Sequence, residues 1–474
     1  MGPTLLIRRA RIGDRLVDVR CAAGVIAAIT DTSVVAAGAD VTVDAGGGAV
    51  IPGLHDHHIH LLALAAAGGS LRLGPPDVDS ASTFDAALRA AAATGTGWLR
   101  GVGYHENVAG PLDRHRLDGL VPHRPVRVQH RGGAMWVLNT AALDMTAIGD
   151  LTLGGVERDG AHVPTGRLFR LDNELRSRVG AATPDLAAVG GTLAGYGVTG
   201  VCDMTPTDDG SDVELLAAAV RTGALPLDVV VTGGLDLPAD AAAALARGPV
   251  KFVLDDHDLP TPDALAVRFR AARVAGRPIA VHCVTRGELV VALAALDEVG
   301  SRPGDRIEHG AVIPVELASE LRERSLVVVT QPSFVAERGD QYLADVEADD
   351  VPHLWRCGSL LAAGVGVGVG TDAPFGHPDP WRTIAAARDR TTPSGAVLGP
   401  SERITAARAL DMFLAPLDDP AGPPRRVVVG AAADLCVLTQ PLAEALRDPV
   451  RAERLATVRR GVDLAGPSSP TTRR

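Results

Sequence analysis

The chain has almost no lysine and few aromatic residues, although arginine and small apolar residues are abundant. Of its 46 basic residues a single one, Lys251, is a lysine, and aromatic residues make up only 3% of the 474 residues. Alanine, valine and leucine must therefore fill the core. Arginine is effectively always protonated, whereas a buried lysine can lose its proton and react as an amine. The pattern indicates that position 251 needs a function that arginine cannot supply. The alternative is that one lysine has remained there by chance.

Long apolar runs, paired cysteines and an excess of positive charge are also missing. Arg8, Arg9 and Arg11 interrupt the N-terminal segment, which predicts neither a signal peptide nor a membrane span there. Five scattered cysteines give no disulfide framework and favour a reducing cytoplasm. A net charge of −11 argues against binding to nucleic acid or to an anionic membrane. We therefore expect a soluble protein of the cytoplasm.

Compact apolar runs separated by helix-like segments dominate the middle of the chain. From the second run onward they recur at the spacing of a βα unit. The eight runs lie at 49–54, 197–204, 226–234, 250–256, 278–284, 306–313, 326–333 and 364–374. Continuous apolar strands with helical crossovers are typical of a buried parallel sheet, and eight of them predict a (β/α)8 barrel. Apolar periodicity predicts helices over 262–276 and 286–300.

The two ends of the chain and the interval after the first run follow other patterns. Alternating apolar and polar segments at both ends predict strands that pair into one small β-sandwich. The interval between the first two runs is far longer than one helix and its loops, which predicts an insertion. We therefore expect a sandwich from 1–49 and 425–474, a barrel over 50–424, and an insertion subdomain over 62–195.

Histidines close the first run, which ends in the letters HDHHIH. In a (β/α)8 barrel the C-terminal ends of the strands form the active site. Because side chains alternate along a strand, His58 and His60 share one face, whereas His55 and His57 share the other with Ile59. Packing of Ile59 against helices favours His58 and His60 as the pair that faces the barrel interior. The roles of His55 and His57 stay open.

Polar residues also close the later runs, namely Lys251, His282, Glu308, His309, Thr371 and Asp372. The histidines, the lysine and the aspartate among them are further candidate ligands. Imidazole and carboxylate groups suit Zn²⁺, Fe²⁺ or Mn²⁺, and a catalytic metal site keeps one position open for water. Two alternatives are structural. Lys251 could form an ion pair with a neighbouring aspartate, and Asp372 could serve only as a helix cap.

An ordered set of motifs resembles the amidohydrolase superfamily. The stretch IPGLHDHHIH is similar to its P-G-x-x-D-x-H-x-H opening. VKFVLDD, IAVHCVTRGE, DRIEHGAVI and GVGTDAPFGHPDPW resemble the branch known as amidohydrolase family 3, which includes N-substituted formamide deformylases. The likeness spans nearly the whole chain and includes the long insertion. It implies that His58 and His60 bind a first metal ion, that His282 and His309 bind a second, and that Lys251 is carboxylated to a carbamate that bridges them.

The resemblance implies metal-assisted hydrolysis of a carbon–nitrogen bond in a small amide, formamide or cyclic amide. One or two divalent ions, with Zn²⁺ the first choice, would activate water. Asp372 would accept the proton of this water, return it to the leaving nitrogen, and also touch the first metal. Deamination of a heterocycle and decarboxylation are alternatives, as is a catalytically inactive homologue that binds a ligand. A homodimer is a possible assembly.

Two departures from the branch pattern predict an altered substrate pocket. Ala134 stands in RGGAMW where many relatives have a histidine, and HCVTR replaces H-A-x-G-D. His105, Glu106 and Trp136 are candidates for substrate contact. Arg286 could meet a substrate carboxylate or lie solvated on the surface.

Overall fold

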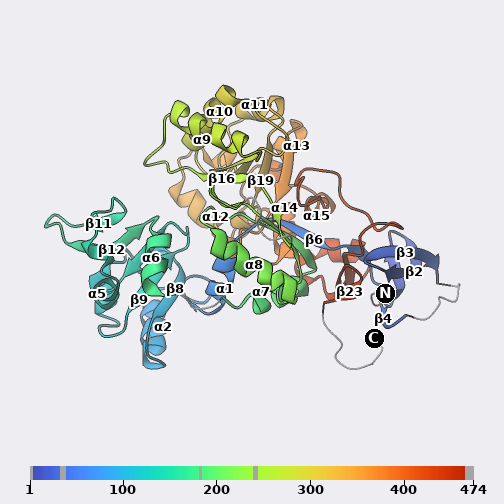
Figure 1. Cartoon of the computed structure of the whole chain (residues 1–474), viewed down its shortest axis with the longest axis horizontal. Helices are drawn as coiled ribbons and strands as arrows, with labels where there is room; N and C mark the ends of the chain where they lie inside the picture. Colours follow the sequence, from blue (N-terminus) through green and yellow to red (C-terminus); the bar gives the residue numbers. More distant parts are fainter. Residues whose placement is uncertain (1–3, 33–38, 181–183, 239–243, 465–474) are drawn as a thin grey trace. The chain divides into compact units, whose positions relative to one another are not determined.

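The computed structural model describes residues 4–32, 39–180, 184–238 and 244–464. Contacts divide the chain into two compact units, one of Met1–Leu61 with Leu186–Arg474 and one of Leu62–Asp185. In Figure 1 the smaller unit carries the labels α2, α5, α6, β8, β9, β11 and β12. Residues 1–3 and 465–474, which the sequence assigns to the sandwich, lie outside the described residues.

Parallel strands form the centre of the larger unit, in two sheets with the orders β15-β14-β13-β6 and β16-β17-β18-β19-β20. Seven of the strands fall within the seven apolar runs predicted from residue 197 onward, so these predictions are confirmed. All nine described strands of the two sheets are β6 (Leu54–Ile59), β13 (Val198–Asp203), β14 (Asp228–Val231), β15 (Ala246–Arg247), β16 (Val250–Val253), β17 (Ile279–Cys283), β18 (Arg306–His309), β19 (Val327–Thr330) and β20 (Gly366–Val369).

Helices follow the strands of the larger unit. The two helices predicted from periodicity are confirmed as α9 (Pro262–Val274) and α10 (Arg286–Val299). Thr261 caps α9, because its hydroxyl accepts the backbone N–H of Ala264. The other described helices are α7 (Leu186–Gly195), α8 (Gly210–Thr222), α11 (Leu317–Glu323), α12 (Ser333–Asp345), α13 (Gly358–Ala362), α14 (Pro380–Asp389), α15 (Ala406–Phe413) and α16 (Leu442–Arg447).

Within the described residues, the parallel strands pair as two separate sheets and not as one closed eight-stranded sheet. Strand pairing stops between β14 and β16, where only the two-residue β15 intervenes, and between β20 and β6. Backbone hydrogen bonds outside the strand ladders bridge these junctions. The N–H of Lys251 donates to the carbonyl of Gly233 at 3.0 Å, and the N–H of Asp372 donates to that of His58 at 2.7 Å. At each junction one of the two bonded residues, Gly233 or Asp372, lies outside a regular strand, so the strand pairing is interrupted there.

The first expected run is divided between two sheets. β5 (Val50–Pro52) pairs with β21 (Leu435–Leu438), whereas β6 begins at Leu54. The expectation of a barrel strand over 49–54 was therefore wrong. Gly53 is the residue at which the chain changes sheets, and a Cβ there would lie 2.2 Å from the side chain of Thr199. This close approach requires glycine, and the letters HDHHI consequently lie within β6.

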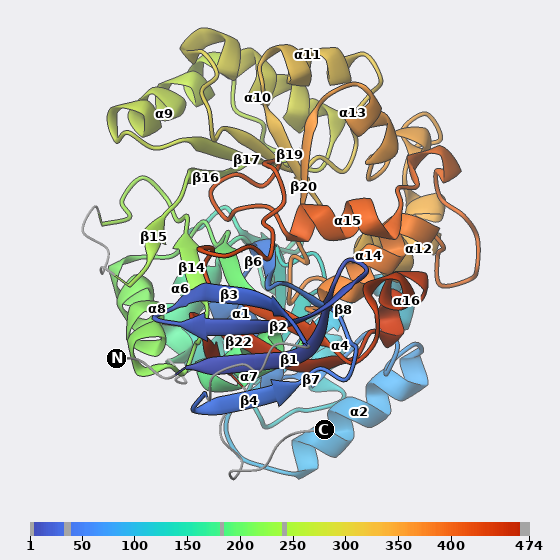
Figure 2. The same ribbon diagram turned by 90° about the vertical axis from the view of Figure 1, so that its right-hand side faces the viewer.

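Strands from both ends of the chain share one apolar core (Figure 2). The four-stranded sheets have the orders β3-β2-β1-β4 and β23-β22-β21-β5. Buried residues of both sheets, such as Ile7, Val19, Val437 and Val458, form a single cluster. The remaining bounds are β1 (Leu5–Ile12), β2 (Arg15–Ala22), β3 (Val25–Asp31), β4 (Val41–Asp44), β22 (Arg454–Arg459) and β23 (Val462–Asp463).

The smaller unit is built on a six-stranded sheet of order β11-β12-β10-β9-β8-β7. Its strands are β7 (Leu71–Arg72), β8 (Leu99–Tyr104), β9 (Val126–His130), β10 (Met135–Leu138), β11 (Val156–Arg158) and β12 (Pro164–Phe169). Its helices are α2 (Ala81–Ala93), α3 (Glu106–Ala109), α4 (Arg114–Asp118), α5 (Thr140–Thr146) and α6 (Asp172–Val179), and α1 (Leu61–Gly68) leads into it. α7 lies within the expected insertion but belongs to the larger unit. No described helix is long and apolar enough to cross a membrane.

Candidate active site

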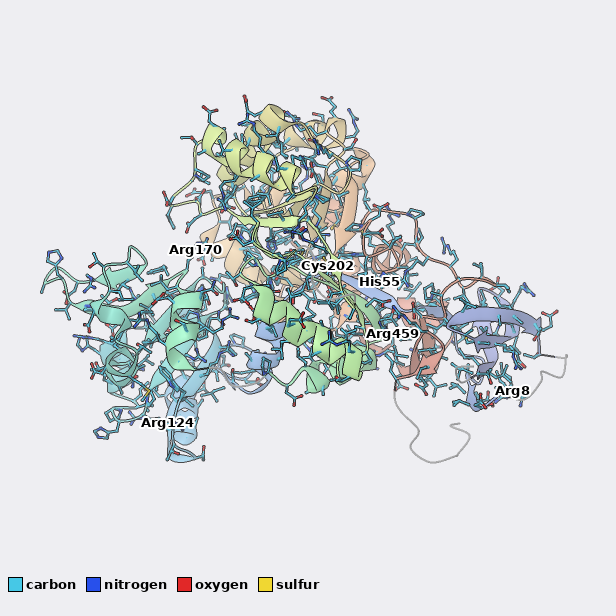
Figure 3. The ribbon with its side chains drawn as sticks, viewed as in Figure 1. Arg8, His55, Arg124, Arg170, Cys202 and Arg459 are labelled. Atoms are coloured by element: carbon cyan, nitrogen blue, oxygen red, sulfur yellow. The ribbon has the colours of Figure 1, made fainter. Side chains whose placement is uncertain are left out.

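One face of β6 holds its two histidines against backbone carbonyls. Nδ1 of His55 lies 2.9 Å from the carbonyl oxygen of Ala415, and Nε2 of His57 lies 3.2 Å from that of Met412. Both rings are buried, and His55 is labelled on its strand in Figure 3. Burial lowers the pKa of His57 to about 3 and that of His55 well below its usual range. These neutral rings fasten β6 to α15 and to the segment that follows it.

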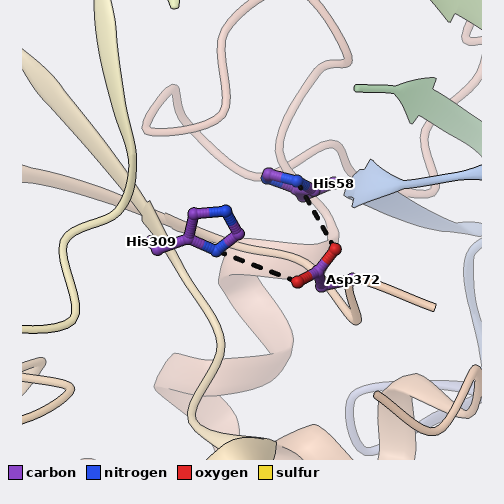
Figure 4. A group of neighbouring side chains, drawn as sticks. All are labelled: His58, His309 and Asp372. Carbon is purple, nitrogen blue, oxygen red and sulfur yellow. Dashed lines mark ion pairs between the residues drawn. The ribbon is translucent and has the colours of Figure 1, made fainter. Parts of the chain in front are cut away.

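The opposite face of β6 brings His58 and His60 to Asp372. Nε2 of His58 lies 3.6 Å from Oδ1 of Asp372, and Nε2 of His60 lies 3.1 Å from the same oxygen. His309 reaches the carboxylate from β18, with 3.9 Å between its Nδ1 and Oδ2 of Asp372 (Figure 4). Nitrogen and oxygen atoms of His58, His309 and Asp372 all lie within 4.8 Å of one another. A buried carboxylate therefore lies among three imidazole rings, with His58 and His60 on one face as alternation predicts.

Oxygen acceptors occupy the Nδ1 side of two of these rings. Nδ1 of His58 lies 2.5 Å from Oε2 of Glu308, and Nδ1 of His309 lies 2.8 Å from Oε1 of Gln331. An oxygen acceptor requires Nδ1 to carry the proton, which leaves Nε2 as the basic nitrogen. Nε2 of His58 is buried without a hydrogen-bond partner among the described residues. Metal-binding histidines are typically oriented in this way, so the residues fit a divalent ion.

Lys251 adds a buried amine to the same region. Its Nζ has no hydrogen-bond partner in the described part of the chain. Burial lowers the pKa of Lys251 to about 8, although the charges of Glu308 and Asp372 act in the opposite direction. A larger fraction of this amine is therefore neutral than in an exposed lysine, and the neutral form is the nucleophilic one.

Asp372 stays ionised despite its burial. Burial raises the pKa of this carboxyl, but its interaction with His58, the hydrogen bond from His60 and the nearby ring of His309 together outweigh burial. The resulting pKa lies well below the ordinary range of an aspartate. Asp372 is therefore a carboxylate that can accept a proton or bind a cation.

Two residues with left-handed backbone direct side chains into the site. His309 has φ 67° and Asp372 has φ 54°, values uncommon outside glycine and enriched at functional sites. Strict alternation would place Glu308 and His309 on opposite faces of β18. Because the backbone turns at His309, Glu308 reaches His58 while the neighbouring His309 reaches Asp372.

Close packing joins the end of β20 to β6. A Cβ at Gly370 would lie 2.6 Å from the backbone nitrogen of His58, so only glycine fits there. Asp56 accepts hydrogen bonds from the backbone N–H groups of Thr371 at 3.0 Å and His58 at 3.1 Å, and from the Thr371 hydroxyl at 2.5 Å. Burial nevertheless raises the pKa of Asp56 to about 6. These contacts hold the backbones that carry His58 and Asp372 against each other.

A family model described as the amidohydrolase family matches residues 41–463. The chain belongs to the amidohydrolase family. The resemblance stated from the motifs is thereby confirmed, as is the expectation of a metal-dependent hydrolase that acts on carbon–nitrogen bonds. Membership excludes none of the substrates considered above.

Known relatives of this amidohydrolase share sequence and fold over most of its length. The N-substituted formamide deformylase of Arthrobacter pascens is 26% identical over 435 residues, which cover 78% of this chain and 79% of the deformylase. The structure of an uncharacterised metal-dependent hydrolase from Pyrococcus horikoshii superposes with a TM-score of 0.71 at 19% identity, and the match covers 97% and 99% of the two chains. N-isopropylammelide isopropylaminohydrolase from Burkholderia multivorans gives a TM-score of 0.53 at 19% identity, with 98% of each chain covered.

Two other predicted site residues of the amidohydrolase lie in its larger unit. The ring of His282, on β17, is centred 4.5 Å from that of His309, so the two candidate ligands are neighbours. Arg286, the first residue of α10, forms an ion pair of 2.6 Å with Asp350. Its side chain is 44% exposed. Its guanidinium is thus already bound to a carboxylate of the chain itself.

His105 and Glu106 meet a third residue, His130, within the smaller unit. Oε2 of Glu106 lies 3.2 Å from Nε2 of His130 and 3.8 Å from Nε2 of His105. Trp136 is buried in the core of this unit, and its indole N–H donates to Asp172 at 2.7 Å. The substrate contact expected for Trp136 stays a prediction.

Sequence reasoning assigned no role to four residues of these groups: Arg306, Glu308, Gln331 and His130. For Glu308 a signal exists. Two adjacent ligand-type residues followed by glycine at a strand end indicate a backbone turn that can bring both inward. Arg306 and Gln331 give no such signal, because their contacts depend on residues far away in the sequence.

Proposed function

We propose that this amidohydrolase hydrolyses the carbon–nitrogen bond of a small amide, formamide or cyclic amide. The observation that carries the proposal is the buried Asp372 carboxylate among His58, His60 and His309. The likeness to an N-substituted formamide deformylase supports N-formyl compounds as the first substrates to test.

The donor set fits one or two divalent ions, with Zn²⁺ the first choice because imidazole and carboxylate ligands suit it. His58 and His60 would hold the first ion and His282 and His309 the second, with Asp372 at the first and a carbamate on Lys251 shared by both. When bound, a divalent ion lowers the pKa of water towards neutrality and polarises the substrate carbonyl. Nε2 of His58 and Nζ of Lys251 have no hydrogen-bond partner among the described residues, which supports this assignment.

Asp372 is proposed as the residue that moves the proton. It is ionised, so a carboxylate oxygen can accept the proton of the attacking water and later return it to the leaving nitrogen. The imidazoles of His58, His60 and His309 surround the carboxylate and fix its orientation. The left-handed backbone at Asp372 further holds the side chain towards these rings.

The scaffold of the proposed enzyme is a (β/α)8 barrel completed by the two parallel sheets, since backbone bonds bridge both junctions. We further propose the sandwich of 1–49 with 425–474, the barrel domain over 50–424 and the insertion over 62–195 as its domains. His105, Glu106, Arg286 and Trp136 are kept as candidate substrate contacts. A cytoplasmic location and a homodimer are also proposals, the latter testable by light scattering.

Metal content tests the centre directly. Wild type, Lys251→Ala and the control Arg270→Ala, which removes an exposed arginine, are purified and their metal content per chain is measured. We expect two ions in wild type and control, and one or none in Lys251→Ala. Labelling with ¹³C-bicarbonate should give a carbamate signal that Lys251→Ala lacks. One ion in all three proteins would contradict the bridging carbamate and favour a mononuclear centre.

Turnover tests the reaction. Metal-replete protein is screened against N-formyl and N-acyl amines and cyclic amides, with Asp372→Asn as the control for contaminating activity. Release of amine by wild type and not by Asp372→Asn is expected. Absence of turnover of every carbon–nitrogen substrate would contradict the proposed function.

A further inference from the structure

A buried ion pair lies directly behind His58. Nε of Arg306 contacts Oε1 of Glu308, and both side chains are almost fully buried, with exposures of 4% and 0%. Both residues come from β18, two positions apart, so alternation directs them to the same face of the sheet. Burying two charges costs desolvation free energy unless close geometry and further hydrogen bonds compensate for it.

The two oxygens of Glu308 have different partners. Oε1 contacts Arg306, whereas Oε2 lies 2.5 Å from Nδ1 of His58. Arg306 is held in turn, because its terminal nitrogen donates to the carbonyl of His57 at 3.3 Å and lies against the sulfur of Cys202, a residue labelled in Figure 3. A guanidinium can only donate, so the partner that it faces must be an acceptor.

We propose that Arg306 and Glu308 are positioning residues that place the proton of His58 on Nδ1 and thereby keep Nε2 as a metal ligand. The inference rests on the proposed metal centre. Arg306 fixes the carboxylate, and the carboxylate accepts the Nδ1–H of His58. The proton therefore cannot occupy Nε2, the nitrogen that faces Asp372, and the ring of His58 cannot turn away from Asp372.

An isosteric variant tests the direction of these bonds. In Glu308→Gln, Arg306 must face the amide oxygen, so the amide NH₂ faces Nδ1 of His58. Nδ1 then has to accept, and the proton moves to Nε2. We expect metal affinity, measured by chelator competition, to fall by about 10–100-fold, the usual cost of losing a partner behind a metal ligand. In metal-free protein, ¹⁵N shifts of His58, assigned with His58→Asn, should report the Nε2–H tautomer.

A second variant separates positioning from structure. In Arg306→Met/Glu308→Gln the amide is free to turn its oxygen to His58, so we expect the Nδ1–H tautomer to return and metal affinity to match that of Arg306→Met alone. Equal loss in the single Glu308→Gln variant and the double variant would overturn the proposal, as would an unchanged tautomer in Glu308→Gln.

Neither readout uses substrate. The ¹⁵N shifts need no metal either, so they remain informative if a variant binds metal too weakly to measure. A wild type that shows these tautomer shifts and binds metal, but hydrolyses no carbon–nitrogen bond, would contradict the proposed function and leave the role of Arg306 and Glu308 intact.

Discussion

Two groups in this protein contain the same residue types, two histidines and a carboxylate, and differ in where their protons lie. In the larger unit, Nδ1 of His58 faces the carboxylate of Glu308. In the smaller unit, Nδ1 of His105 accepts the backbone N–H of Asn107 at 3.2 Å, and Nδ1 of His130 accepts that of Gly132 at 3.1 Å. The first group is buried, whereas the side chain of Glu106 in the second is 39% exposed.

This difference decides what each group can bind. A neutral imidazole carries one proton. When Nδ1 donates, Nε2 is free for a metal ion, as in the group of His58, His309 and Asp372. When Nδ1 accepts, Nε2 carries the proton and becomes a donor, here towards Glu106. We therefore expect metal chemistry in the first group, and in the second a carboxylate held by imidazole N–H groups.

The largest expected effect is on turnover. Asp372→Asn removes the proposed proton acceptor, and kcat should fall by about 10²–10⁴-fold, the range that general acid–base catalysis contributes. The matched change Glu106→Gln should leave kcat unchanged, with any effect confined to KM. Steady-state kinetics on the best amide or formamide substrate measure both. An equal loss of kcat in the two variants would show that the comparison is mistaken.

Metal affinity should separate the groups next. His309→Ala removes a proposed ligand. The loss of metal affinity should exceed the roughly 10–100-fold that is typical when a residue hydrogen-bonded to a metal ligand is removed. His130→Ala should leave affinity and stoichiometry unchanged. Chelator competition followed by elemental analysis makes the measurement. Loss of one ion from His130→Ala would place a metal site in the smaller unit.

A pH-dependent stability difference should come from Asp56 in the larger unit. Its pKa in the folded protein is about 6, against an ordinary value of 3.8 for an aspartate. A raised pKa stabilises the folded state below the unfolded pKa, and this contribution is lost as pH rises through 6. Relative to Asp56→Asn, metal-free wild type should therefore lose up to about 3 kcal/mol between pH 4 and pH 7. Urea denaturation across this range tests it, and parallel curves for the two proteins would contradict it.

The smallest expected effect concerns two glycines that lie beside the histidines. Gly370→Ala forces a Cβ against the backbone of His58 and should cost about 1–3 kcal/mol, as overpacking usually does. In Gly132→Ala the new Cβ would lie 3.2 Å from Nδ1 of His130, a side chain that can move, so the cost should be smaller. Thermal denaturation compares the two. A greater loss in Gly132→Ala would show that the second group is the more rigid.

Sequence patterns predicted local features well and long-range pairing less well. Seven strands and the two periodic helices lie where apolar runs and periodicity place them. The first strand was wrong because Gly53 lets the chain change sheets, a choice made by packing against Thr199. The division of the parallel strands into two sheets was likewise not predictable, because pairing at the junctions depends on residues that lie outside the strands.

The sequence by itself determined which residues could do chemistry. Alternation separated His58 and His60 from His55 and His57, and composition singled out Lys251, because both are local properties of the chain. Only the tertiary structure decided the proton positions and the left-handed turns at His309 and Asp372. Glu308 lies 250 residues from His58, and no local pattern encodes which nitrogen of a ring will face such a partner.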